Sequence, residues 1–230
     1  MKVELRPEFS TQNPDDVPIM AARGDYMEES LVGKNIHDVL QDITIDSEGY
    51  DPQERLEHMH KRLIRRGHFG PYEHIQAYFT VEGISRPCMA QATRHRFISY
   101  DVQSMRYANF SESGFKCPPA FTLEEIDGVP VSETVAEHFK RSVELYTELV
   151  DNGYEEEDAR YVLPLGTKVN MSFSANARTL MHFIDMRAAG DAQWEIIELA
   201  EKVLEEAEDW APITFATYED YARGSSKKAP

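Results

Sequence analysis

The chain has 230 residues, of which 41% are hydrophobic and 10% aromatic, and its formal net charge is −17. This length and composition predict a single globular domain over residues 1–223 and exclude an extended disordered protein. No apolar run reaches the roughly eighteen residues that cross a membrane, and the N-terminus lacks a signal peptide's apolar core, so we expect a cytoplasmic protein. The negative charge disfavours a nucleic-acid polymer as ligand.

The cysteines and the ends of the chain add little chemistry. Cys88 and Cys117 lie in no C-x-x-C motif, so we expect neither a disulfide framework nor a metal site. Of the 24 basic residues only nine are Lys, and an acidic, Arg-rich balance is typical of proteins from a high-salt cytoplasm. The final GSSKKAP sequence, residues 224–230, predicts a disordered tail.

Several helices and one strand are predicted in the first half of the chain. In order they are a short helix over 17–23, a long loop over 40–51, a helix from Pro52 until Gly67, a strand over 75–82 and a helix over 86–94. Asp51 and Ser85 are the expected N-caps of the last two helices. His58 and His60 point in opposite directions on their helix, which favours two surface imidazoles over a metal site.

The second half alternates irregular and regular segments. Its predicted elements are a turn at Tyr100 and Asp101, an extended segment over 104–110, an irregular excursion over 111–131, a helix from Ser132 to Gly153, a short helix from Glu155, a strand over 167–174, a helix capped by Asn176, and a last helix from Asp191 to about Trp210. On an extended segment Ser104 and Arg106 point the same way, which would form a phosphate cradle.

The stretch from Gln91 to Asn109 concentrates positive charge in an acidic chain. Arg94, His95, Arg96 and Arg106 fall within thirteen residues, together with tyrosines and hydroxyl groups. An ordinary explanation is a solvated surface with carboxylate partners, which this chain has in excess. The alternative is a pocket for an anion attached to flat rings, such as a nucleotide.

Three motifs favour the nucleotide pocket. Arg94-His95-Arg96, a gap of seven residues and then Ser104 resembles the RHR-x7-S signature of the flavin-dependent thymidylate synthases. The sequence around Arg160, Ala-Arg-x-x-Leu-Pro, is similar to a second segment of that family. Asn176-Ala-Arg178, followed by Arg187 and Ala-Gln-Trp-Glu, resembles a third.

The resemblance, which covers roughly residues 67–195, implies a fold, a reaction and a set of site residues. The fold is a mixed α+β subunit that assembles as a homotetramer with its sites between subunits. The reaction is methylation of dUMP to dTMP, with methylenetetrahydrofolate as carbon donor, reduced FAD as hydride donor and NADPH as reductant. The implied flavin contacts are His68, Gly70, Arg94, His95, Arg96, Asn176, Arg178 and His182. The implied nucleotide contacts are Gln91, Arg94, Ser104, Met105, Arg106, Arg160 and Arg187, of which Arg187 would act in catalysis.

Two rival functions stay open on the sequence. The chain could be a non-catalytic regulator that binds nucleotide and flavin, or a nucleic-acid binding module that uses the basic stretch. The net charge of −17 argues against the second.

Overall fold

A computed structural model describes residues 1–41 and 51–225 of the chain. The chain divides into two compact units. The first comprises Met1–Lys2, Val81–Arg94 and Tyr100–Ser172, and the second comprises Val3–Thr80, His95–Ser99 and Phe173–Pro230. The predicted single domain over 1–223 stays a prediction. The predicted tail over 224–230 lies largely outside the described residues, as does most of the loop predicted over 40–51.

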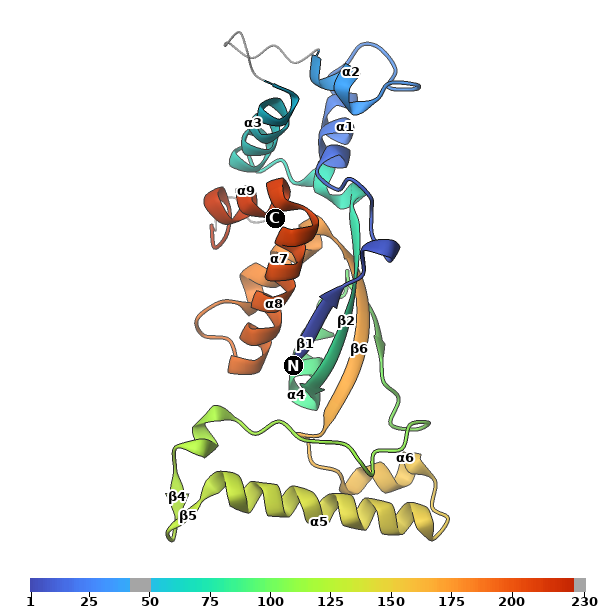
Figure 1. The fold of residues 1–230 in the computed structure, drawn as a ribbon, viewed down its shortest axis with the longest axis vertical. Coiled ribbons are helices and arrows are strands. Elements are labelled where there is room, and N and C mark those ends of the chain that lie inside the picture. The colour runs from blue at the N-terminus through green and yellow to red at the C-terminus, as the bar shows by residue number, and fades with distance from the viewer. Residues whose placement is uncertain (42–50, 226–230) are drawn as a thin grey trace. The chain divides into compact units, whose positions relative to one another are not determined.

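Both units contain helices and strands, which confirms the predicted α+β class (Figure 1). The strands are β1 (Lys2–Leu5), β2 (Gln76–Ser85), β3 (Ser99–Val102) and β6 (Lys168–Asn176), in the sheet order β1-β2-β6-β3, and the hairpin β4 (Glu125–Ile126) and β5 (Val129–Pro130). The α-helices are α1 (Asp16–Gly24), α2 (Ile36–Gln41), α3 (Pro52–Arg65), α4 (Arg86–Ala92), α5 (Val131–Asp151), α6 (Glu156–Ala159), α7 (Ala177–Arg187), α8 (Trp194–Trp210) and α9 (Pro212–Tyr221). The 3-10 helices are η1 (Pro7–Phe9), η2 (Gly70–His74), η3 (Pro119–Thr122) and η4 (Arg160–Val162).

The second unit packs α7, α8 and α9 against one another, with α3 against α9 (Figure 1). Helix α3 begins in a capping box, in which the Asp51 carboxylate accepts from the Glu54 amide and the Glu54 carboxylate accepts from the Asp51 amide. Such a box contributes about 1 kcal/mol and fixes where the helix starts. Phe79 of β2 stacks on Phe173 of β6 at 4.8 Å, and both rings are buried in this unit's core.

The first unit holds the short helix α4 and the long helix α5. The Ser85 hydroxyl accepts from the Cys88 amide at 3.2 Å and so caps α4. On α5 only Phe139 and Tyr146 are buried, and Phe139 stacks on Phe115. Gly153, with φ of +86°, ends the helix in a conformation that other residues adopt with strain. Much of the predicted apolar stripe of α5 is therefore left half-exposed.

Most predicted elements lie where expected, but the segment after the basic tripeptide was assigned wrongly. The short strand is β3, where a turn was predicted, and residues 104–108 form a turn in which Ala108 donates to the Ser104 carbonyl at 3.1 Å. The sequence pattern does not predict β1, α2 or α9, and Gln193 rather than Asp191 caps α8.

His60 corrects another prediction, because it is buried rather than on the surface. One ring nitrogen lies 3.0 Å from the Tyr72 hydroxyl and the other 2.8 Å from the Asp15 carbonyl oxygen. Burial lowers the pKa of this imidazole, so it serves the core as a neutral hydrogen-bonding group.

No helix within residues 1–41 or 51–225 is both long and apolar enough to cross a membrane.

Candidate active site

A hydrogen bond joins two of the predicted site residues in the second unit, although they lie 92 positions apart. Arg187, in the last turn of α7, donates from Nε to Nε2 of His95 at 2.8 Å. A guanidinium group has no acceptor, so His95 must accept through a lone pair on Nε2 and carry its own proton on Nδ1. The geometry therefore requires a neutral imidazole.

The surroundings of His95 hold it in that neutral form. Burial, the positive charge of Arg187 and the neighbouring His182 together lower its pKa to about 4. The sequence motif places His95 among the groups that would hold an anion by charge. At neutral pH the permanent charge of the pair instead resides on Arg187, and His95 orients that guanidinium group.

Two rings of α7 fix the position of the imidazole. The His95 ring meets the ring of Phe183 edge-on at 5.0 Å and the ring of His182 at 5.8 Å. Phe183 is buried, whereas His182 is exposed. Phe183 therefore supports His95 from the core side, while His182 borders solvent.

The start of α7 carries two more predicted flavin contacts. Asn176 caps the helix, because its side-chain oxygen accepts from the Thr179 amide at 2.8 Å. Arg178 forms an ion pair with Glu73 of η2 at 2.6 Å, and both side chains are about half-exposed. Both residues therefore already have structural tasks, and Arg178 would have to exchange a carboxylate for a ligand.

In the first unit, Glu157 gathers two of the predicted nucleotide contacts. Arg106 Nε donates to the Glu157 carboxylate at 2.5 Å, and Arg160 Nε donates to the Glu157 carbonyl oxygen at 2.9 Å. The extended segment that would form the phosphate cradle is a turn instead. In this turn the Ser104 hydroxyl oxygen accepts from the Arg106 backbone amide at 3.2 Å.

A cavity of about 410 Å³ in the same unit brings Arg160 and Met105 together. It is lined by Arg86, Met105, Arg160, Tyr161, Leu163, Pro164 and Leu165. Arg86, the first residue of α4, is not among the predicted site residues. A cation at a helix N-terminus is electrostatically unfavourable, and this anomaly could have marked Arg86 as a candidate anion-binding residue.

The remaining predicted residues are distributed over both units. Gln91 on α4 and the exposed Arg94 belong to the first unit, whereas the exposed Arg96 belongs to the second. Gly70 begins η2 in the second unit.

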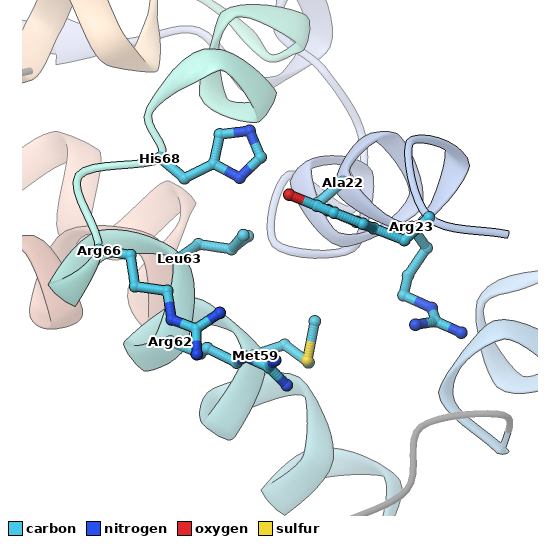
Figure 2. A pocket seen from close by; sticks show the side chains of 8 residues that line it. Ala22, Arg23, Met59, Arg62, Leu63, Arg66 and His68 are labelled. Carbon is cyan, nitrogen blue, oxygen red and sulfur yellow. The ribbon is translucent and has the colours of Figure 1, made fainter.

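His68 lines a separate cavity of about 460 Å³ in the second unit, shown in Figure 2. Within the part of the chain that the structure describes, no three His, Cys, Asp or Glu side chains are grouped as metal ligands.

Comparisons with known proteins identify the family. The family model described as thymidylate synthase complementing protein matches residues 9–213. A flavin-dependent thymidylate synthase from Haloarcula marismortui is 44% identical over 241 aligned positions, which cover 95% of this chain and 96% of the relative. The chain belongs to the flavin-dependent thymidylate synthase family. The resemblance read from the three motifs is thereby confirmed.

A second curated relative and one solved structure are also similar to this chain. A relative from Halobacterium salinarum, with the same name, is 42% identical and covers 91% of this chain and 92% of its own length. The crystal structure of the UMP/dUMP methylase PolB from Streptomyces cacaoi, bound with 5-Br dUMP, matches with a TM-score of 0.76 and 26% identity. That match covers 100% of this chain and 97% of PolB, so the likeness extends well beyond the motifs.

Proposed function

We propose that this chain converts dUMP to dTMP, with methylenetetrahydrofolate as carbon donor, FAD as the bound flavin and NADPH as reductant. Family membership supports the thymidylate synthase reaction, and the 5-Br dUMP bound to PolB supports a deoxyuridine nucleotide as substrate. The folate, the NADPH and a homotetrameric assembly rest on the sequence resemblance.

The hydrogen bond between Arg187 and His95 is the observation that carries the catalytic part of the proposal. It holds a permanent cation in one orientation through an uncharged ring, which adds no charge of its own to the pair. A guanidinium fixed at the carbonyl edge of a uracil ring would stabilise the negative charge that develops when the ring is activated. A preorganised donor of this kind is typically worth about 3 kcal/mol or more.

Arg187 is thus the proposed catalytic residue, and His95 is a positioning residue that acts through it. Phe183 supports the imidazole from the core. The guanidinium group is therefore already oriented and loses little conformational entropy when substrate binds.

The polar residues of α7 suit a flavin. FAD has phosphates and a polar, flat ring system, and α7 carries guanidinium, imidazole and amide donors along its length, on Arg178, His182 and Asn176. When bound, the reduced flavin would supply the hydride. Arg178 would turn from Glu73 towards the flavin. Its ion pair with Glu73 is half-exposed, so breaking the pair costs little free energy. His68, Gly70, Arg94 and Arg96 are the other proposed flavin contacts.

The cluster around Glu157 is the proposed site for the nucleotide phosphate. Arg106 and Arg160 would exchange their hydrogen bonds to the Glu157 oxygens for hydrogen bonds to the phosphate. Guanidinium groups bind phosphate in bidentate geometry. Gln91, Arg94, Ser104 and Met105 complete the proposed nucleotide contacts.

The proposed homotetramer would cover apolar surface that is exposed in a single chain. Tyr161 is 83% exposed and Leu165 is 72% exposed beside the Arg160 cavity, and Leu145 of α5 is 45% exposed. In such an assembly Arg160 would reach the nucleotide phosphate of a neighbouring subunit, as the resemblance implies.

The visible spectrum and turnover of the purified protein test the function. We expect a yellow protein whose absorbance in the blue is bleached by NADPH, and which then forms dTMP from dUMP and methylenetetrahydrofolate. A protein that binds flavin and dUMP but forms no dTMP under these conditions would instead be the non-catalytic regulator. A colourless protein that cannot be reconstituted with FAD would contradict the proposal.

A further inference from the structure

The cavity beside His68 combines cationic and aromatic groups, and no carboxylate is among the described residues that line it (Figure 2). Its volume of about 460 Å³ falls within the range of small-molecule sites. The lining residues are Ala22, Arg23, Tyr26, Met59, Arg62, Leu63, Arg66 and His68. Three of these eight side chains are guanidinium groups, and none is acidic.

The periodicity of α3 places half of this lining on one face of the helix. Met59, Arg62, Leu63 and Arg66 are spaced by three, one and three positions, which is the spacing of a single helical stripe. Met59 and Leu63 are buried and form an apolar floor, whereas Arg62 and Arg66 are exposed at the rim. The stripe therefore presents an apolar surface bordered by two cations.

The end of α3 turns His68 towards the same cavity. The His68 amide donates to the Leu63 carbonyl at 3.0 Å and the Gly67 amide donates to the Ile64 carbonyl at 2.9 Å, which is a Schellman motif. Gly67 has φ of +73°, as this motif requires. The His68 ring then meets the Tyr26 ring edge-on at 6.5 Å, so two aromatic groups line the cavity.

The cationic groups of the cavity lack counter-charges among residues 1–41 and 51–225. The guanidinium groups of Arg23, Arg62 and Arg66 form no ion pair there, and Arg23 Nε is buried without a hydrogen-bond partner. By contrast, Lys61 on another face of α3 lies 3.9 Å from Glu57. Three like charges around one cavity repel one another, and a buried donor without a partner is costly, so an anion here would be stabilising.

We propose that this cavity binds the anionic end of a co-substrate, a carboxylate or phosphate group attached to an aromatic ring. Arg62 and Arg66 would hold the anion, Arg23 would complete its hydrogen bonds, and Tyr26 would pack on the ring. The inference rests on the proposed function, whose two co-substrates both have this chemistry. A folate carries glutamyl carboxylates beside an aminobenzoyl ring, and NADPH carries a ribose phosphate beside adenine.

A double variant, Arg62→Ala with Arg66→Ala, tests the site in the flavin-loaded enzyme, with Lys61→Ala as a matched control on the same helix. We expect KM to rise at least about tenfold for one co-substrate, because two charge-assisted hydrogen bonds are lost. Two comparisons identify the source of the anion. A folate site would lose its preference for pentaglutamyl over monoglutamyl folate, and an NADPH site would lose its preference for NADPH over NADH. Lys61→Ala should change neither.

Two results would overturn the inference. One is a folded double variant with unchanged KM values for both co-substrates. The other is loss of bound flavin, which would mean that the cavity serves the flavin. Direct calorimetric titration of the wild-type and double-variant proteins with pteroylpentaglutamate and with NADP⁺ separates this inference from the proposed function. A tenfold weaker binding of either ligand to the variant would support the cavity even if no dTMP were formed, and equal binding would reject it.

Discussion

The His95–Arg187 pair and the Glu157 cluster both present guanidinium groups, but their counter-groups differ. Arg187 is bonded to a neutral imidazole, which does not itself compensate the positive charge of the guanidinium group. Arg106 is bonded to a carboxylate, so its charge is already compensated. The first arrangement suits a group that must meet charge as it develops, and the second suits a group that exchanges one anion for another.

Exposure separates the two regions further. The side chains of Arg106 and Glu157 are 52% and 44% exposed, and ion pairs this exposed contribute at most about 1 kcal/mol. A nucleotide phosphate can therefore displace Glu157 at little cost. His95 is instead held by the buried Phe183 ring, so the Arg187 pair is preorganised.

Removal of the Arg187 side chain should have the largest effect. Arg187→Ala is expected to lower kcat by about 100-fold to 1,000-fold and to change the dissociation constant of dUMP much less, because the charge it meets is greatest in the transition state. Single-turnover kinetics and equilibrium dUMP binding check this. Arg187→Lys keeps the positive charge without the planar guanidinium group, so its kcat should lie between those of the wild-type and Arg187→Ala proteins. Equal losses in turnover and affinity would remove Arg187 from the catalytic role.

The Glu157 cluster should respond in binding rather than in turnover. Arg106→Ala is expected to weaken dUMP binding by about tenfold, since one charge-assisted phosphate contact is lost. Glu157→Gln should strengthen binding by a few-fold, because Arg106 no longer has to leave a carboxylate. Glu156→Gln, on the same helix, is the control and should leave affinity unchanged. Weaker binding in Glu157→Gln would contradict the exchange.

The neutral state of His95 predicts a pH effect on stability. The unfolded chain binds a proton at this histidine below a pH of about 6.5, whereas the folded chain does so only below about 4. Between these values the unfolded state binds more protons, so the contribution of His95 is fully present above pH 6.5 and is lost as the pH falls. His95→Asn should lack this loss, with a difference on the order of 1–2 kcal/mol after solvent screening. Urea denaturation of both proteins at several pH values measures it, and parallel curves would contradict a neutral His95.

The sequence predicted local structure well wherever a local signal decides it. The cap at Asn176, the cap at Ser85 and the glycine at the end of α3 follow from rules that act over a few residues. The turn at Ser104 was not predicted because two local structures compete there. The Ser104 hydroxyl can accept from a nearby backbone amide and so stabilise a turn, whereas the alternating residue pattern favours an extended segment.

The sequence predicted which residues belong to the candidate site, but not their protonation states or hydrogen-bond partners. The motifs named both His95 and Arg187, yet only the fold brings them within 2.8 Å and assigns the proton to Nδ1. The same holds for His60, whose burial depends on Tyr72 and the Asp15 carbonyl from other elements. Arg23 and Arg62 showed no motif at all, because their significance lies in a shared cavity that forms only when α1 packs against α3.

Neither guanidinium region includes a thiol, so the smallest effect on turnover should come from the cysteines. Cys88 is buried in α4 and Cys117 is half-buried, and we expect the Cys88→Ala, Cys117→Ala protein to keep full turnover with a small loss of stability from the buried position. Turnover and flavin content of the folded protein check this. Lost turnover with intact folding and flavin would indicate that a thiol attacks the uracil ring.

Complementation between two impaired variants, assayed at a dUMP concentration below the dissociation constant of the Arg160→Ala protein, tests most directly whether the two regions act together across subunits. Arg187→Ala and Arg160→Ala chains, carrying different tags, are co-expressed and the mixed assemblies are isolated. We predict dTMP formation well above that of either variant alone, because some sites then combine an intact Arg187 with an intact Arg160 from the neighbouring chain. Pairing Arg187→Ala with a chain that carries both substitutions should give no recovery. Mixed assemblies that form but stay inactive would contradict a site built from both regions on different subunits.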